Sequence, residues 1–300
     1  MRLSRYAFVV VAIAVFASST DAATAVHLVS WNVHGPVLKH SRIVRMHAVV
    51  DEVRRRDPDF ILLQEVWFRS DAALFAHAFE PLGYVRIEKK SHWPHHLSGL
   101  LIFVSTKRGW SVENGYDFQQ YHRHAAWWRV WEADGLGRKG ILRQNVKKGD
   151  TRLAVIVTHT QAQYGRRDYC EIRGDQVNQL LAYTKRLDPS IPFILAGDFN
   201  TAPTGSCDGP IYQTMTTAWT ELTKDAREEC LNEHDPRLVE PRACGSHWED
   251  DGRLSNEWID YVFTRLGDDV RAVKVELIRN QAEDWPFSDH EGVDAELLVP

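Results

Sequence analysis

The sequence predicts one α/β domain in which two β-sheets pack face to face and helices cover their outer sides. Two observations lead to this fold class. Apolar runs of strand length recur along the whole chain and outnumber the helical patterns. No repeat, low-complexity tract or linker divides the chain. Because each sheet has to bury a face against another layer, this pattern favours two packed sheets. We expect a single domain over residues 26–300.

The elements follow from apolar periodicity, taken in chain order. Residues 41–56 carry apolar side chains at helical spacing, and Pro58 lies just beyond the predicted end of that helix. Further helices are expected at residues 71–79 and 175–186. The expected strands are residues 26–31, 60–64, 99–104, 141–146, 153–158, 191–196, 258–263, 273–278 and 295–299.

Composition limits the function classes only loosely. The 300 residues are 44% hydrophobic and 26% charged, which is ordinary for a globular protein. A formal net charge of -5 gives no overall basic surface for nucleic acid. This argues weakly against a nuclease, because a bound metal can neutralise phosphate locally.

The N-terminus predicts a signal peptide over residues 1–25. Arg2 and Arg5 precede an apolar stretch at residues 6–17, which is too short to cross a bilayer. Small residues follow, and cleavage is expected near Ala22–Ala25. An uncleaved anchor is the less favoured alternative. The protein is therefore expected to be secreted or periplasmic.

The cysteine count fits an exported protein. Cys170, Cys207, Cys230 and Cys244 form an even set, which suggests two disulfides. Three pairings are possible. We favour Cys170–Cys207 with Cys230–Cys244, because the second pair closes a short loop that contains two prolines.

The segment Gly197-Asp198-Phe199-Asn200-Thr201 is the strongest local sign of chemistry. It follows a buried strand pattern, and side chains two residues apart in an extended chain lie on the same side. Asp198 offers a base for a water molecule, and Asn200 offers hydrogen bonds to an anion. Alone the segment is also ordinary turn chemistry.

Polar residues stand at the ends of other predicted strands. A carboxylate that backs a histidine stabilises its imidazolium form. Asp289 is a poor partner for His290, because adjacent residues on a strand face opposite ways, and Asp260 is the better one. Each residue also has a structural alternative as a cap, a turn or an ion-pair member. The set is Asn32, Glu65, His159, Asp260, Asp289 and His290.

Taken together, the motifs resemble the endonuclease/exonuclease/phosphatase superfamily. They cover nearly all of the expected mature chain. The resemblance implies a DNase I-like fold, a four-layered α/β sandwich, with divalent-metal-dependent cleavage of phosphoesters. In chain order the motifs are Ser-Trp-Asn32-Val-His-Gly, Leu-Gln-Glu65-Val, Ser98-Gly-Leu-Leu-Ile, Thr-His159-Thr-Gln-Ala, Gly-Asp198-Phe-Asn-Thr, Ile-Asp260-Tyr-Val and Ser-Asp-His290.

The resemblance also implies residue roles on the metal side. Glu65 is the expected main Mg²⁺ ligand, with Asn32 at or beside the metal shell. Asp289 completes the acidic cluster on this side. Oxygen ligands of this kind suit a hard cation, and Mn²⁺ or Co²⁺ would be alternatives.

On the phosphate side, Asp198 is expected to position or deprotonate the attacking water. Asn200 binds the scissile phosphate, and His159 contacts one of its oxygens. His290, backed by Asp260, stabilises the charge that grows in the transition state.

A closer resemblance concerns the substrate. The residues after His159, including Arg173 and Gln176, are similar to secreted neutral sphingomyelinase C, as are Lys139-Gly140 and residues 257–261. This implies a phospholipid substrate at a membrane surface: sphingomyelin, cleaved to ceramide and phosphocholine. No protein partner is implied.

Aromatic residues are the candidates for contact with a membrane. Interfacial tryptophan places its ring at headgroup level, although core packing or a substrate cleft explains the tryptophans equally well. The segment at residues 280–287 is short, so the long aromatic hairpin of some bacterial sphingomyelinases is reduced or absent. The candidates are Trp93, Trp127, Trp128, Trp131, Trp285 and Phe287.

Two alternatives remain open. A secreted endonuclease of the same superfamily would contact DNA phosphates through basic residues. A non-catalytic binding protein is disfavoured, because none of the expected site residues is replaced. The basic residues available to a nuclease groove are Arg123, Arg129, Arg138, Lys139 and Arg143.

Overall fold

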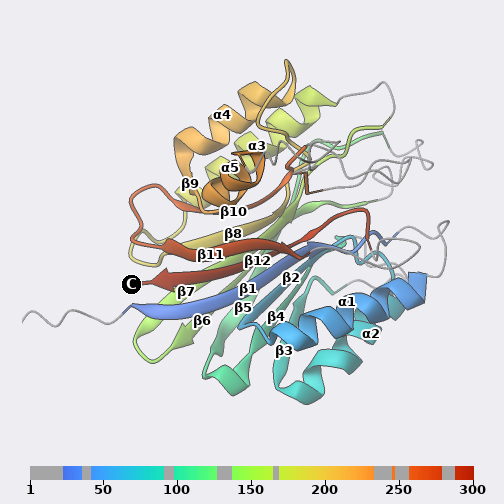
Figure 1. Ribbon diagram of the computed structural model, residues 1–300, viewed down its shortest axis with the longest axis vertical. Coiled ribbons are helices and arrows are strands. Elements are labelled where there is room, and N and C mark those ends of the chain that lie inside the picture. Colours follow the sequence, from blue (N-terminus) through green and yellow to red (C-terminus); the bar gives the residue numbers. More distant parts are fainter. Residues whose placement is uncertain are drawn as a thin grey trace, which may run out of the picture.

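Two six-stranded sheets pack face to face between two layers of helices, which confirms the predicted fold class (Figure 1). The structure is a computed structural model. It describes residues 23–35, 42–90, 98–126, 137–164, 169–232, 245–246, 257–278 and 288–300. Within these ranges, no helix combines the length and apolar character needed to cross a membrane. The predicted signal peptide lies almost entirely outside the described residues and stays a prediction.

The first sheet carries two helices on its outer face, where α1 and α2 bury residues such as Val49 and Phe75 against Phe103. Its strand order is β11-β12-β1-β2-β4-β3. The strands are β1 (Thr24–Asn32), β2 (Phe60–Gln64), β3 (Tyr84–Glu88), β4 (Leu101–Ser105), β11 (Arg271–Ile278) and β12 (Gly292–Val299). The helices are α1 (Arg42–Arg56) and α2 (Arg69–Phe79), with short 3-10 turns at Glu80–Leu82 and Thr106–Arg108.

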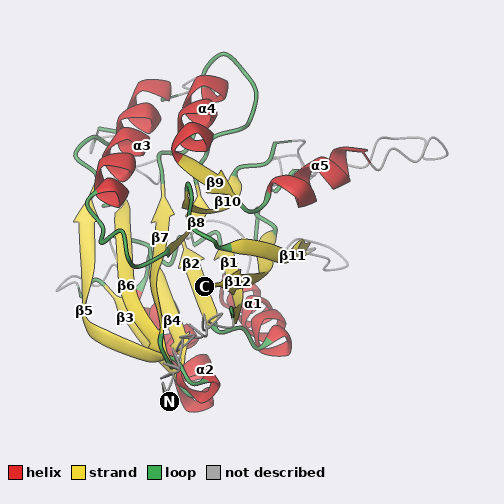
Figure 2. Ribbon diagram, turned by 90° about the vertical axis from the view of Figure 1, so that its left-hand side faces the viewer, coloured by secondary structure: helices red, strands yellow, loops and turns green. Residues whose placement is uncertain are grey.

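The second sheet is covered by α3 and α4 on the opposite side of the molecule (Figure 2). Its strand order is β5-β6-β7-β8-β10-β9. The strands are β5 (Ser111–Gln120), β6 (Gly140–Lys148), β7 (Thr151–His159), β8 (Phe193–Asp198), β9 (Trp219–Glu221) and β10 (Asp260–Arg265). The helices are α3 (Cys170–Lys185), α4 (Asp208–Ala218) and α5 (Lys224–Asn232).

The packing of the sheets brings four strand ends together. Their inner faces share one buried apolar core, which includes Leu62 and Ile194. In the first sheet β1 runs parallel to β2, and Asn32 stands beside Gln64. In the second, β7 runs parallel to β8, and His159 stands beside Asp198. Since carboxyl ends of parallel neighbours meet at one edge, each sheet presents its polar residues at such an edge.

Several boundaries differ from the sequence prediction. The sequence analysis missed β3, β5, β9, α4 and α5. Helix α3 begins at Cys170, five residues before its predicted start at residue 175, and it follows Tyr169, whose backbone is left-handed (φ 51°). The predicted Cys170–Cys207 disulfide is confirmed, with a Cα–Cα distance of 5.5 Å. Cys244 lies outside the described residues.

Candidate active site

Asn32 links the two sheets at the centre of the site. Its amide Nδ2 donates to Glu65 Oε1 at 3.3 Å and to Asp198 Oδ2 at 2.9 Å. Glu65 follows β2 of the first sheet, whereas Asp198 ends β8 of the second. The sequence placed Asn32, Glu65 and Asp198 at strand ends, and the structure brings these three residues together.

The backbone of Glu65 is strained in a way that serves the site. Its φ is 61°, a conformation that costs a non-glycine residue about 1–3 kcal/mol. A Cβ at residue 35 would lie only 1.9 Å from the carbonyl oxygen of Glu65, so residue 35 has to be glycine. The turn buries Val66 in the core and leaves the Glu65 side chain partly exposed at 16%.

The surroundings of Glu65 fit a divalent cation. Its carboxylate accepts hydrogen bonds from two neutral groups, Asn32 Nδ2 and Trp67 Nε1, the latter at 3.4 Å. Its Oε1 lies 3.9 Å from His159 Nε2, and Arg45 interacts with it electrostatically. A partly buried carboxylate and the Oδ1 of Asn32, which also accepts from the backbone N–H of His34 at 3.0 Å, are oxygen ligands of the kind that suits Mg²⁺ or Mn²⁺.

Asp289 lies on the same side of the site but has its own partner. Its Oδ2 is 2.6 Å from His34 Nδ1. Arg45 connects the two acids electrostatically, because it interacts with both Asp289 and Glu65. Asp289 thus belongs to the acidic side of the site, and its predicted role as a metal ligand stays a prediction.

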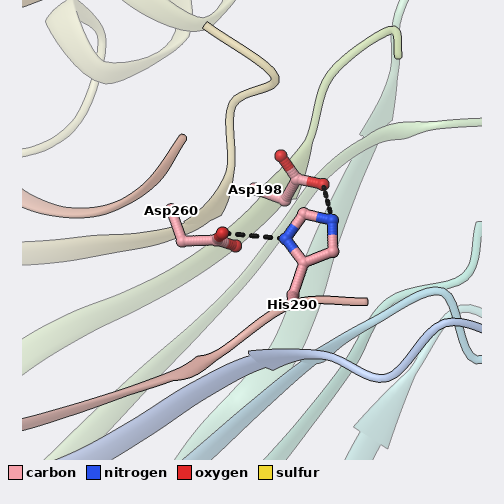
Figure 3. A group of neighbouring side chains, drawn as sticks. All are labelled: Asp198, Asp260 and His290. Atoms are coloured by element: carbon pink, nitrogen blue, oxygen red, sulfur yellow. Dashed lines mark hydrogen bonds and ion pairs between the residues drawn. The ribbon is translucent and has the colours of Figure 1, made fainter. Parts of the chain in front are cut away.

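A histidine between two carboxylates forms the opposite side (Figure 3). His290 Nδ1 is 2.8 Å from Asp260 Oδ2, and its Nε2 is 3.6 Å from Asp198 Oδ2. The pairing of His290 with Asp260 rather than Asp289 is the one that the sequence favoured. Ser246 fixes Asp260 further by donating to Oδ2 at 2.7 Å.

Charge and burial set the protonation states of this group. Burial alone would lower the pKa of His290, but the charges of Asp260 and Asp198 and the hydrogen bond that His290 donates to Asp260 hold that pKa well above its usual value. Burial raises the pKa of Asp198 to about 7, opposed mainly by the charge of His290. The group therefore holds an imidazolium next to a carboxylate that can accept a proton near neutral pH.

The same three residues bring one ligand atom each within 4.8 Å of one another, a spacing that would also suit a metal. We favour the proton-holding arrangement for Asp198, Asp260 and His290. His290 Nδ1 is already occupied by Asp260, and a raised pKa keeps a proton where a metal would need a lone pair.

Hydrogen bonds between side chains and the backbone hold His290, which precedes a strand of the first sheet, in contact with the second sheet. Ser288 Oγ donates to the carbonyl of Asn32 and accepts from His290 N at 3.1 Å. Trp31 Nε1 donates to the carbonyl of His290 at 2.9 Å. These contacts fix the residue before β12 begins.

His159 is completely buried, and a lysine stands beside it. Lys139 Nζ lies 2.9 Å from His159 Nε2 and donates to the carbonyl of Thr160 at 2.7 Å. Burial, and then the charges of Lys139 and His290, lower the pKa of His159 well below its usual value. His159 is therefore neutral, and its Nε2 is 3.3 Å from Asp198 Oδ2. Its predicted contact with a phosphate oxygen stays a prediction.

Asn200 is held in a tight turn after β8. Its φ is 46°, and its backbone N–H donates to Asp198 Oδ1 at 2.8 Å. Its Nδ2 donates to the carbonyl of Thr160 at 3.2 Å. The side chain is half-buried, which leaves part of the amide at the site surface.

The sequence analysis missed two residues of the site, Trp67 and Ser246. It named Lys139 only for the Lys-Gly turn of the sphingomyelinase resemblance and as a candidate for a nuclease groove, not as a partner of His159. Ser246 is separated from its partner Asp260 by residues without a recognisable motif.

A family comparison agrees with this architecture. Residues 29–290 match the profile described as the Endonuclease/Exonuclease/phosphatase family. No curated protein matches the chain significantly in sequence.

Solved structures show the same fold. The chain is similar to an endonuclease/exonuclease/phosphatase from Bacteroides vulgatus, with 16% identity, a TM-score of 0.67, and coverage of 92% of this chain and 100% of that one. The chain is also similar to the human Nocturnin catalytic domain with bound sulfate, with 16% identity and a TM-score of 0.66. The match covers 92% of this chain and 94% of that one. A third similar structure is D. rerio TDP2 complexed with single strand DNA product, with 15% identity and a TM-score of 0.66. The match covers 91% of this chain and 99% of that one.

Proposed function

The chain belongs to the Endonuclease/Exonuclease/phosphatase family, and we propose that it is a metal-dependent phosphodiesterase that hydrolyses a phospholipid headgroup. One observation carries the chemical part of this proposal. An oxygen-ligand side with Glu65 and Asn32 faces a proton-holding side with Asp198 and His290 across two packed sheets.

The described side chains supply the proton chemistry. Asp198 takes the proton of the attacking water, because its raised pKa makes it a stronger base than an ordinary carboxylate. His290 remains cationic under the influence of Asp260 and places positive charge where the phosphate gains negative charge. Asn200 offers its amide to the phosphate, and Lys139 adds a buried positive charge behind His159.

Glu65 and Asn32 would hold the divalent cation. When bound, Mg²⁺ would polarise the phosphoryl oxygen and offset its charge. Mn²⁺ or Co²⁺ would serve the same ligands, which are all oxygen atoms.

The choice of sphingomyelin rests on the resemblance in sequence. Two of the residues that carry this resemblance, Arg173 and Gln176, act as scaffold. Gln176 Oε1 accepts from the backbone N–H of Gln161 at 2.8 Å, and Arg173 donates to Asp208 at 2.6 Å. Gln176 thus supports the loop after His159, and Arg173 ties α3 to the start of α4. We propose a secreted or periplasmic enzyme that acts at a membrane surface. The membrane-facing tryptophans proposed from the sequence lie outside the described residues.

A nuclease is the second candidate, because D. rerio TDP2 is bound to a DNA product. The basic groove that it needs is poorly supported here. Arg123 forms ion pairs with Glu171 and Asp175, and Lys139 is buried inside the site. Arg129 lies outside the described residues.

A paired assay tests the proposal. Purified protein with Mg²⁺ should release phosphocholine from sphingomyelin in mixed micelles and leave plasmid DNA largely uncut, and excess EDTA should abolish the activity. Cleavage of DNA alone would select the nuclease. Full activity in EDTA would reject metal-dependent chemistry altogether.

A further inference from the structure

Trp67 is an aromatic side chain built into the site without a role in the proton chemistry. It follows the strained turn at Glu65, and its backbone N–H donates to the carbonyl of Glu65 at 3.0 Å. Its indole Nε1 donates to Glu65 Oε2 at 3.4 Å, and its ring centroid is 6.2 Å from that of His159. Trp67 therefore stands beside the oxygen ligands and the phosphate position at once.

Two glycines hold the indole in place. A Cβ at Gly99, whose φ is +67°, would lie 2.8–3.0 Å from three atoms of the six-membered ring. A Cβ at Gly35 would lie 3.0 Å from the Cδ1 atom at the opposite end of the indole. The ring is fixed at both ends yet only half-buried, which leaves part of its surface open to a ligand.

The chemistry of this surface favours a cation. The indole N–H is already used by Glu65, so the ring offers its π-electrons rather than a hydrogen-bond donor. Tryptophan is the best aromatic partner for a quaternary ammonium group.

We propose that Trp67 is the specificity-determining residue for the headgroup and binds the trimethylammonium group of a phosphocholine diester. This inference rests on the proposed function and names the part of the substrate that the site selects. A nucleotide base stacked on the same ring is the competing occupant and is an outcome of the test.

The test compares two soluble diesters, p-nitrophenyl phosphocholine and the choline-free bis-p-nitrophenyl phosphate. In the wild-type protein the ratio of their kcat/KM values measures choline selectivity. Trp67→Leu should lower this ratio about tenfold, or about 1.4 kcal/mol, through a higher KM for the choline ester. Trp67→Phe keeps an aromatic ring without the indole N–H and should retain most of the ratio.

Controls separate this inference from the proposed function. Tyr116→Leu removes an exposed aromatic from β5, away from the site, and should leave the ratio unchanged. If Trp67→Leu fails to fold by circular dichroism, the comparison is phosphocholine binding by calorimetry to His290→Ala, with and without the non-aromatic substitutions Trp67→Met and Trp67→Gln. Equal phosphocholine affinity in these proteins overturns the inference.

An unchanged ratio in Trp67→Leu also overturns the inference, even while hydrolysis of the choline ester by the wild type upholds the proposed function. Hydrolysis of bis-p-nitrophenyl phosphate and DNA, without hydrolysis of the choline ester, rejects the headgroup. In that case, weaker oligonucleotide binding by Trp67→Leu assigns base stacking to the ring.

Discussion

The two sheets contribute different chemistry to one site. The first sheet places Glu65 in a partly exposed position beside the buried Asn32, where the backbone of Glu65 is strained and its carboxylate meets neutral donors. The second sheet places Asp198 and Asp260 in buried positions, and burial raises the pKa of Asp198 to about 7.

This difference follows from what each side has to do. Ligands for a hard cation need oxygen atoms that the ion can reach, and the partly exposed carboxylate of Glu65 offers them. Groups that hold or move a proton need displaced pKa values, and burial is the strongest cause of such displacement. His290 precedes β12 of the first sheet, but its side chain contacts Asp260 and Asp198 of the second sheet. It therefore joins the two sides of the site.

The largest expected effect comes from removing the proton chemistry of the second sheet. Asp198→Asn and His290→Ala should each lower kcat by about 10²–10⁴-fold, because each removes a group that acts on a proton or on growing charge. Steady-state kinetics at saturating Mg²⁺ measures this. Asp188→Asn, an exposed carboxylate before β8, is the control. Near wild-type turnover in both site variants would show that the chemistry lies elsewhere.

A change on the first sheet should act through the metal. Glu65→Gln keeps the size of the side chain but removes its charge, so the Mg²⁺ concentration for half-maximal activity should rise about 10–100-fold, with partial recovery at high Mg²⁺. A metal titration of activity and calorimetry with Mg²⁺ both report it. Glu80→Gln, on an exposed turn, is the matched control. Loss of kcat without a change in metal dependence would contradict the division between the sheets.

Asp260→Asn should lower kcat by about 10–100-fold and also move the pH profile. The charge of Asp260 raises the pKa of both His290 and Asp198. Without this charge His290 loses its proton at a lower pH, so the alkaline limb of the profile shifts to lower pH. The pKa of Asp198 also falls, so the acid limb shifts to lower pH as well. A pH series of kcat/KM checks the direction. If kcat/KM fell by the same factor at every pH, with both limbs in place, Asp260 would act through packing alone.

Lys139→Met should give the smallest change, a loss of about tenfold, with a shift in the opposite direction. Lys139 lowers the pKa of Asp198, so its removal raises that pKa and moves the acid limb to higher pH. Lys139→Arg should keep the limb near its original position. An acid limb that does not move in Lys139→Met would separate Lys139 from the proton chemistry.

The sequence predicted the parts of the fold that bury continuous apolar runs. Strands β2 and β8 each begin with four consecutive apolar residues, and both were placed to within two residues. The missed elements lack this signal. Strand β9 has three residues, and β5 changes register between Val112 and Tyr116 and so breaks the alternation.

The site was predictable where a residue directly follows such a strand, as Glu65 does. Lys139 and Ser246 were not, since a buried lysine and a distant serine are identified only by the partners that folding brings to them. The pattern after His159 was recognisable, yet in the structure its residues support a loop. A sequence resemblance can thus report a shared scaffold as readily as a shared substrate.

The position of β12 has a consequence for the order in which the protein matures. This strand lies between β11 and β1, and it begins two residues after His290. A ribosome therefore has to complete the last strand before the first sheet can close and His290 can reach Asp260. We expect a nascent chain that lacks residues 288–299 to be inert, whatever its second sheet has already formed. Regain of activity during refolding should report the final step of assembly.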